Sequence, residues 1–459
     1  MRAVTTPRNR PLLLAGARVV TMDARRRVLD ADVVVEDGRI AGLSRAGKDG
    51  GRRGRTGEGG RKPVEIDCAG LVILPGLIQA HIHLCQTLFR GLADDLPLED
   101  WLAKRIWPLE AAHTEDTVYW SAMLGGAELL LGGTTAILDM ETVRHTGAAF
   151  EALETIGLRA TAGKCLMDAP ATPAALREPT DRALEEAADL CARWHGAAGG
   201  RLRYCYAPRF APSCTGPLLR AVSDLAAKAG AVIHTHAAET PTELQTVKRE
   251  TGNDEVAYLD SVGIAGPRAT LAHCVWVDQE GIRRLASQRT NVAHCPSSNL
   301  KLGSGIAPIP EMLAAGCRVG LGADGAPCNN QLDVFAEMRL AALIQKPRLG
   351  PDALPAAQVL ELATLGGARA LGLENEIGSV EVGKRADLVV LDLSGPHGQP
   401  EGADLLSRVV YSARAADVRH VLVDGRVVVR HGRLLSADVE EIRREANRSA
   451  RRLRRAVGL

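Results

Sequence analysis

The feature of this sequence that most restricts its fold is a series of eight short apolar segments separated by longer amphipathic ones. This alternation is typical of repeated strand–helix units, which pack as parallel strands under a layer of helices. Eight such units predict an α/β fold of the (β/α)8, or TIM-barrel, type. The predicted strands cover residues 71–83, 134–140, 158–168, 202–209, 231–239, 270–276, 291–299 and 317–325.

Both ends of the chain predict a second, smaller unit. Residues 33–43 and 421–430 each contain a β-branched run, an Asp-Gly pair and a second β-branched run, which indicates a β-hairpin. The Gly- and Arg-rich stretch 44–63 lacks apolar periodicity and predicts a solvated loop. The predicted domains are a β-sandwich from both termini (1–73 and 374–435), a TIM-barrel hydrolase domain (74–373) and a C-terminal helix (436–459).

The composition favours a small-molecule ligand. The 459 residues include 56 Lys and Arg against 55 Asp and Glu, so no charge excess indicates nucleic acid or an anionic membrane as partner. The ten cysteines are scattered without a CxxC pair and predict reduced thiols rather than disulfides. No apolar stretch approaches the roughly 18 residues of a membrane span, and no signal peptide is evident, so we expect a cytoplasmic protein.

Polar side chains close five of the predicted strands. In a TIM barrel the C-terminal ends of the strands meet at one mouth, where active sites lie. Two neighbouring histidines can be ordinary packed or surface residues, but burying many ionisable groups together without partners would cost several kcal/mol each. The sequence therefore predicts a metal site at the mouth. Its candidate groups are His81 and His83 on the first strand, His234, His236 and Glu239 on the fifth, His273 on the sixth, His294 on the seventh and Asp324 on the eighth.

Five motifs extend this interpretation: PGLIQAHIH, HTHAAE, AHC, HCPSSNLKLGSG and GADGAPCNNQLDVFAEMRLA. Together they resemble the amidohydrolase superfamily, and within it the deaminases of purines and related amino-heterocycles. The resemblance implies one divalent metal held by His81, His83, His236 and Asp324. Zinc suits these ligands best, with Fe²⁺ or Mn²⁺ as alternatives. Arg209 stands where dinuclear members carry a bridging lysine, which favours a single metal.

The same resemblance implies hydrolytic release of ammonia from a ring carbon. A divalent metal lowers the pKa of bound water from about 15.7 toward about 7, which makes hydroxide available at neutral pH. Glu239 would deliver protons to the ring nitrogen and to the leaving ammonia. Asp324 would take the proton of the attacking water, and His273 would hydrogen-bond that water or the developing oxyanion. His234 would support the ligands.

The residues expected to bind substrate give conflicting signals about the ring. By resemblance to nucleoside deaminases, Trp101 would pack on the substrate, although a core position also explains it, and Glu110 would hold ribose hydroxyls. Gln86 instead sits where guanine deaminases place a purine-reading glutamine, and Arg209 stands where adenosine deaminases often have a histidine. Our first hypothesis is a deaminase of 5'-deoxyadenosine, methylthioadenosine or S-adenosylhomocysteine. The second is a guanine-, pterin- or triazine-type aminohydrolase or chlorohydrolase.

Several further points stay open at the level of sequence. A metal-binding barrel without catalysis is a third hypothesis, disfavoured because no acid, base or ligand is missing. The family resemblance implies a homo-oligomer. Lys164 is either ion-paired or functional, and His294 and Asn299 are structural or substrate-facing.

Overall fold

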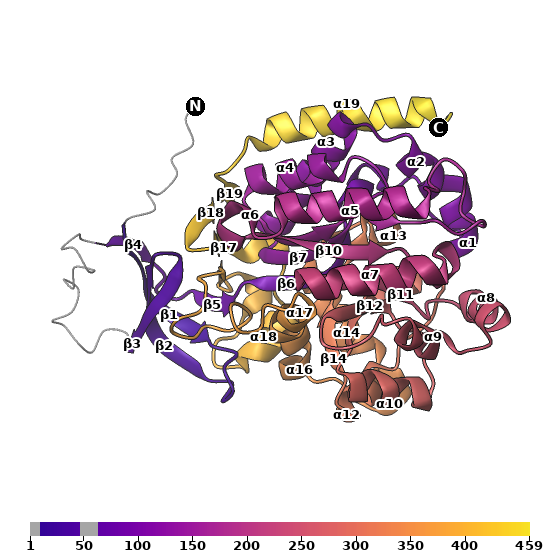
Figure 1. The fold of residues 1–459 in the computed structure, drawn as a ribbon. Coiled ribbons are helices and arrows are strands. Elements are labelled where there is room, and N and C mark those ends of the chain that lie inside the picture. Colours follow the sequence, from indigo (N-terminus) through magenta and orange to yellow (C-terminus); the bar gives the residue numbers. More distant parts are fainter. Residues whose placement is uncertain (1–9, 46–62) are drawn as a thin grey trace.

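The computed structural model describes residues 10–45 and 63–459, and its larger sheet is a closed parallel barrel (Figure 1). Strand β14 pairs with β13 and β15 pairs with β6, so these two short strands together close the ring. The predicted TIM barrel is therefore confirmed. The barrel strands are β6 Leu77–His83, β7 Thr134–Met140, β8 Arg159–Gly163, β9 Cys165–Leu166, β10 Leu202–Pro208, β11 Val232–Ala237, β12 Ala269–His273, β13 Asn291–His294, β14 Arg318–Leu321 and β15 Asp324–Gly325.

Two of the eight strand positions are interrupted. The third consists of β8 and β9, with Lys164 between them, and the eighth of β14 and β15, with Gly322 and Ala323 between them. A Cβ atom on Gly322 would lie 2.7 Å from the carbonyl oxygen of His81. Only glycine permits this approach of the two backbones, which brings Asp324 beside the end of β6.

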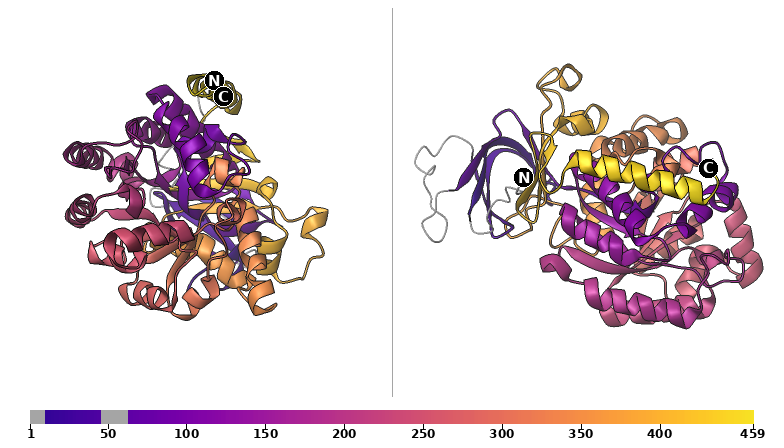
Figure 2. Two further views of the ribbon diagram at one scale, coloured as in Figure 1. Left: turned by 90° about the vertical axis from the view of Figure 1, so that its right-hand side faces the viewer. Right: turned by 90° about the horizontal axis from the view of Figure 1, so that it is seen from above.

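Helices follow the strands and surround the barrel (Figure 2). Helix α7 illustrates how the sequence sets their limits: Thr215 Oγ1 accepts a hydrogen bond from the backbone N–H of Leu218, and Gly230 ends the helix at φ 66°. The α-helices are α1 Leu98–Trp101, α2 Trp107–Ala111, α3 Glu115–Leu131, α4 Thr146–Ile156, α5 Thr180–Trp194, α6 Ala197–Gly200, α7 Gly216–Ala229, α8 Pro241–Thr251, α9 Glu255–Ser261, α10 Gln279–Gln288, α11 Pro296–Lys301, α12 Ile309–Ala314, α13 Ala326–Asn329, α14 Val334–Ile344, α15 Lys346–Leu349, α16 Ala356–Glu361, α17 Gly367–Ala370, α18 Leu405–Tyr411 and α19 Val439–Ala456.

The second sheet joins strands from both ends of the chain, as the sequence predicts. Its order is β19-β18-β17-β16-β5-β1-β2-β3, with β4 paired to β1. Both predicted hairpins are present, with turns at Asp37-Gly38 and Asp424-Gly425. The strands are β1 Leu12–Val20, β2 Val28–Glu36, β3 Arg39–Arg45, β4 Val64–Asp67, β5 Val72–Pro75, β16 Leu388–Leu391, β17 Val418–Val423, β18 Arg426–Arg430 and β19 Arg433–Leu434.

The first predicted strand, 71–83, is in fact two strands. Strand β5 pairs with β1 and β16 in the second sheet, whereas β6 belongs to the barrel. Gly76 separates them, and a Cβ atom there would lie 2.0 Å from Thr135 Oγ1. The continuous apolar run reflects burial in two different cores, which sequence periodicity does not distinguish.

The seventh predicted strand, 291–299, is shorter than expected. Strand β13 ends at His294, and helix α11 begins at Pro296, a residue whose fixed φ suits the first turn of a helix. Ser297, Ser298 and Asn299, which were expected on the strand, therefore lie on helix α11 at the barrel mouth.

Three other predictions concern the chain as a whole. All ten cysteines are buried and free, as predicted. Within residues 10–45 and 63–459 no helix is long and apolar enough to cross a membrane. Most of the predicted loop 44–63 lies outside the described residues. Its first two residues, 44 and 45, belong to the end of strand β3.

Candidate metal and catalytic site

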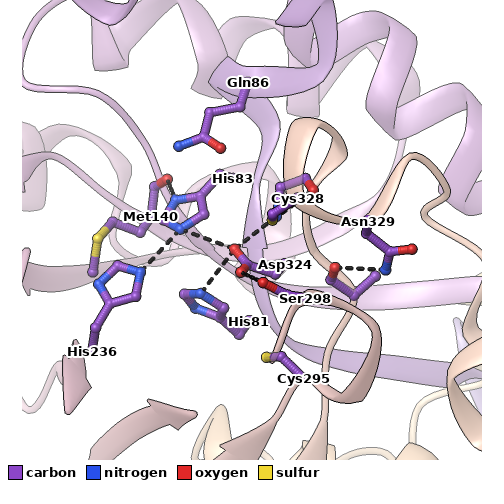
Figure 3. Close-up of polar contacts among 12 residues, drawn as sticks. His81, His83, Gln86, Met140, His236, Cys295, Ser298, Asp324, Cys328 and Asn329 are labelled. Atoms are coloured by element: carbon purple, nitrogen blue, oxygen red, sulfur yellow. Dashed lines mark hydrogen bonds and ion pairs between the residues drawn. The ribbon is translucent and has the colours of Figure 1, made fainter. Parts of the chain in front are cut away.

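Four side chains from three barrel strands converge at the mouth (Figure 3). His81 and His83 alternate with Ile82 on β6 and therefore share one face of the strand. The Nε2 atoms of His81 and His83 lie 3.2 and 3.3 Å from Oδ1 of Asp324, and His83 Nε2 lies 3.1 Å from His236 Nε2. The potential ligand atoms thus meet at one point, as the sequence predicts for a metal site.

Hydrogen bonds on the far side of each imidazole aim its Nε2 atom at this point. His83 Nδ1 donates to the carbonyl oxygen of Met140 at 2.7 Å, and His236 Nδ1 donates to that of Arg209 at 2.5 Å. His81 Nδ1 lies 2.8 Å from His234 Nε2, which gives His234 the predicted supporting position. Partners of this kind set the tautomer and orientation of metal-binding histidines.

The protonation states also suit a cation. Burial lowers the pKa of His81 and His236, and burial together with His81 lowers the pKa of His83 to about 3, and these shifts favour the neutral imidazole that binds a metal. His81 Nε2 is buried and lies 3.2 Å from Asp324 Oδ1, a contact that does not satisfy it as a hydrogen bond, so it has no hydrogen-bond partner among the described residues. A buried polar atom of this kind is costly unless something binds it, and a metal ion fits this position.

Asp324 is held as a carboxylate beside the histidines. Burial alone would raise its pKa, but the neighbouring His81, His83 and His273 hold the pKa of Asp324 well below its usual range. Ser298 Oγ donates a 2.6 Å hydrogen bond to Oδ2, leaving Oδ1 directed at the ligand histidines. Asp324 has φ 61°, a left-handed conformation that is uncommon for aspartate and is maintained by the surrounding structure.

Glu239 and His273 lie beside this centre. His273 Nε2 is 3.6 Å from Glu239 Oε2 and 3.9 Å from Asp324 Oδ2, and its Nδ1 donates to Asn299 Oδ1 at 2.9 Å. Burial raises the pKa of Glu239 to about 7, although His273 opposes the shift. A carboxyl group that gains and loses a proton near neutral pH is suited to general acid–base chemistry.

Two acidic residues that our sequence interpretation missed hold the backbone around Glu239. Glu243 Oε2 accepts the N–H of Glu239 at 2.7 Å, and Glu255 Oε2 accepts the N–H of Ala238 at 2.9 Å. The pattern Thr240-x-x-Glu243 is a helix capping signature and could have indicated Glu243. No comparable local signal points to Glu255, which lies on the next helix.

A pocket opens over these groups, and three of the four predicted substrate residues line it: Gln86, Trp101 and Arg209. Glu110 does not. Its carboxylate binds Arg209 at 2.7 and 3.2 Å and accepts a 2.9 Å hydrogen bond from Gln86 Nε2. The structure thus places the Glu110 carboxylate against Gln86 and Arg209 and not in the pocket lining. The structure adds Phe210 and three leucines, Leu98, Leu102 and Leu302, to the lining.

The remaining candidates have separate environments. Lys164 is completely buried and ion-paired with Glu178 and Glu186, at 2.8 and 2.9 Å. His294 is buried, and burial lowers its pKa to about 3. Neither belongs to the groups that gather at the metal point.

Comparison with known proteins agrees with this geometry. The model of the amidohydrolase family matches residues 72–428, which include all four proposed ligands. The chain belongs to the amidohydrolase family. It is 44% identical over 427 residues to a 5-methylthioadenosine/S-adenosylhomocysteine deaminase of Desulforudis audaxviator, covering 93% of this chain and 95% of the relative.

Two further relatives of this amidohydrolase extend the comparison. A 5'-deoxyadenosine deaminase of Methanosarcina acetivorans is 39% identical over 444 residues, covering 96% of this chain and 98% of the relative. The crystal structure of an adenosine deaminase from Xanthomonas campestris with bound zinc superposes with a TM-score of 0.89 at 32% identity, covering 98% of this chain and all of that one.

Proposed function

We propose that this amidohydrolase is a metal-dependent hydrolytic deaminase that releases ammonia from a purine nucleoside modified at its 5' position. The observation that carries the chemistry is the Glu239 carboxyl, with a pKa near 7, beside His273 and four converging ligands. The substrate class is supported by relatives named for 5-methylthioadenosine, S-adenosylhomocysteine and 5'-deoxyadenosine, which match almost the whole chain.

His81, His83, His236 and Asp324 would hold one divalent ion, most simply Zn²⁺, with Fe²⁺ or Mn²⁺ as alternatives. Three imidazoles and a carboxylate are a donor set typical of zinc, and the Xanthomonas relative contains zinc. Such an ion supplies a water activated for attack at neutral pH.

The chain's own groups would move the protons. Asp324 would accept a proton from the attacking water, and His273 would hydrogen-bond the oxygen that adds to the ring carbon. Glu239 would protonate the ring nitrogen, regain a proton that originates from the attacking water and passes through Asp324, and then protonate the departing amine. The three residues line one pocket, with His273 Nε2 3.6 Å from Glu239 Oε2 and 3.9 Å from Asp324 Oδ2.

A second function is favoured by a specific feature of the pocket. Gln86 Oε1 is buried without a partner in the described chain, and Arg209 lines the same pocket. An amide oxygen and a guanidinium on one wall can bind the edge of a bare ring. A guanine-, pterin- or triazine-type substrate would use them. Neither proposal requires nucleic acid or a membrane, and cytoplasmic location and homo-oligomeric assembly stay predictions.

One assay separates the two functions. We would measure ammonia release from 5'-deoxyadenosine, methylthioadenosine, S-adenosylhomocysteine, adenosine, guanine, a pterin and an aminotriazine. We expect the highest kcat/KM with a 5'-modified nucleoside. Guanine or a triazine turning over much faster than every adenosine derivative would replace the first proposal by the second, and no ammonia from any compound would contradict both.

A further inference from the structure

The catalytic role proposed for Glu239 requires its carboxyl group to be held in one orientation. A proton carrier must lie within hydrogen-bond reach of both the donor and the acceptor of the proton. One oxygen, Oε2, faces His273 at 3.6 Å. The other, Oε1, accepts a 3.2 Å hydrogen bond from the hydroxyl of Ser304. Ser304 is 2% exposed and is not part of the proton-transfer chemistry described above.

The backbone around Ser304 is shaped to present this hydroxyl. Gly303 and Gly305, on either side, have φ of 72° and 129°, conformations that side chains rarely adopt. The N–H groups of Ser304 and Gly305 both donate to the carbonyl oxygen of Asn299, at 2.8 and 3.3 Å. Asn299 also accepts the hydrogen bond from His273. One short segment, 299–305, therefore contacts both Glu239 and His273.

Trp276, a partly exposed residue, hydrogen-bonds to this segment. Its side chain is 48% exposed, which by itself would be an ordinary surface aromatic residue. Its indole N–H, however, donates a 2.7 Å hydrogen bond to the carbonyl oxygen of Ser304, and its backbone N–H donates to Ala238 at 2.9 Å. A Cβ atom on Gly305 would lie 3.6 Å from the indole nitrogen, so the segment packs closely on the ring.

We propose that Ser304 is a positioning residue that orients the Glu239 carboxyl group through its hydroxyl, and that the indole N–H of Trp276 holds Ser304 in place. The inference rests on the proposed function, because it concerns the residue assigned there as proton carrier. Segment 299–305, which includes the end of helix α11, follows strand β13, and Trp276 follows the neighbouring strand β12. Contacts from two neighbouring parts of the barrel mouth would thus orient the Glu239 carboxyl group.

Removing the hydroxyl should affect turnover more than substrate binding. We expect Ser304→Ala to lower kcat by about 10- to 100-fold, the range for one hydrogen bond to a charged group, with KM changed less than about twofold. Ser304→Thr keeps the hydroxyl and should recover most of kcat. Metal content and thermal midpoint should match the wild type in both variants. The substrate is 5'-deoxyadenosine, or guanine if guanine proves faster.

Trp276→Phe tests the second part of the proposal separately, because it removes the indole N–H and keeps an aromatic ring. We expect kcat to fall about 3- to 10-fold. The double variant with Ser304→Ala should be no slower than Ser304→Ala alone, because both changes act through the same hydroxyl. Leu300→Ala, on the same segment with a side chain 43% exposed, is the matched control and should retain wild-type kcat.

The outcomes separate this inference from the proposed function. Wild-type kcat in both Ser304→Ala and Trp276→Phe, with Glu239→Gln inactive, would overturn the positioning role and leave the deaminase assignment intact. Multiplicative losses in the double variant would overturn the link between Trp276 and Ser304. An active Glu239→Gln would instead contradict the proposed function itself.

Discussion

At the scale of single residues, the protonation of Glu239 depends on where its side chain is buried. The side chain lies among His273, Ser304 and other buried carboxyl groups, and loss of solvent raises its pKa to about 7. Asp324 is also buried, but three histidines hold its pKa low. Two carboxyl groups in one pocket therefore differ in protonation because their neighbours differ, and this difference divides their proposed roles.

The Glu239→Gln variant tests this division. Glutamine has nearly the same shape and touches none of the four proposed ligands, so metal content should equal that of the wild type. Proton transfer would be lost, and we expect kcat to fall about 10²- to 10⁴-fold. Elemental analysis and steady-state kinetics on the same preparation check both parts. Loss of metal in step with loss of activity would show that Glu239 acts on the ligands instead.

At the scale of elements, the first turns of two helices hold the end of β11. Helix α8 supplies Glu243 and helix α9 supplies Glu255, and together they accept the N–H groups of Glu239 and Ala238. Ala238 has φ 53°, a left-handed conformation costing about 1–3 kcal/mol that persists only when neighbouring contacts enforce it. The helix starts thus stabilise the turn that carries the proposed catalytic acid.

The Glu243–Glu255 pair should make stability depend on pH. Burial raises the pKa of both carboxyl groups, and the charge of Glu243 raises the pKa of Glu255 further. The native state therefore keeps a proton that the unfolded chain releases near pH 4.5, so stability falls as pH rises from there through the raised pKa. We expect the thermal midpoint of Glu255→Gln to decrease less than that of the wild type between about pH 6 and about pH 9, a range above the pKa of an unfolded glutamate.

Glu250→Gln is the matched control for this measurement. Glu250 is exposed on the same pair of helices, so its substitution should leave the wild-type pH dependence unchanged. Equal midpoint changes in wild type and Glu255→Gln would show that the buried pair does not retain an extra proton.

At the scale of the whole molecule, one buried ion pair joins the barrel to the second sheet. Arg159 on β8 donates to Asp387, just before β16, at 2.6 and 2.9 Å, and the two side chains are 2% and 1% exposed. The C-terminal helix α19 packs on α3 outside the barrel (Figures 1 and 2). Two C-terminal segments therefore brace the central barrel.

Removing the carboxylate should destabilise the entire fold. Asp387→Ala leaves the buried Arg159 charge without its main partner, so we expect the free energy of unfolding to fall by about 3–5 kcal/mol. Glu280→Ala removes an exposed pair with Arg283 and should cost about 0–1 kcal/mol. Chemical unfolding measures both, and similar losses in the two variants would contradict the bracing role.

The proposed metal also joins distant parts of the barrel, because three of its ligands come from the paired strands β6 and β15 and the fourth, His236, comes from β11. We expect about one divalent ion per chain, since the fourth strand is followed by Arg209, paired with Glu110, and not by a bridging lysine. Chelation should abolish turnover and lower the thermal midpoint, because bound metal stabilises the native state. Two retained ions per chain, with activity depending on the second, would contradict the mononuclear assignment.

The sequence by itself determined the barrel, the terminal sheet and the converging histidines. These features are encoded locally: strand periodicity, Asp-Gly turns and polar residues at strand ends can each be read within about ten residues. His81 and His83 lie on one face of β6 simply because side chains alternate along a strand.

Only the tertiary structure decided which distant groups meet. It divided the run 71–83 between two sheets, paired Glu110 with Arg209 across 99 positions, and brought Ser304 to Glu239 across 65. Glu255 reaches Ala238 from another helix. Contacts of this kind depend on how packed elements approach one another, and no local pattern of apolar and polar residues records that approach.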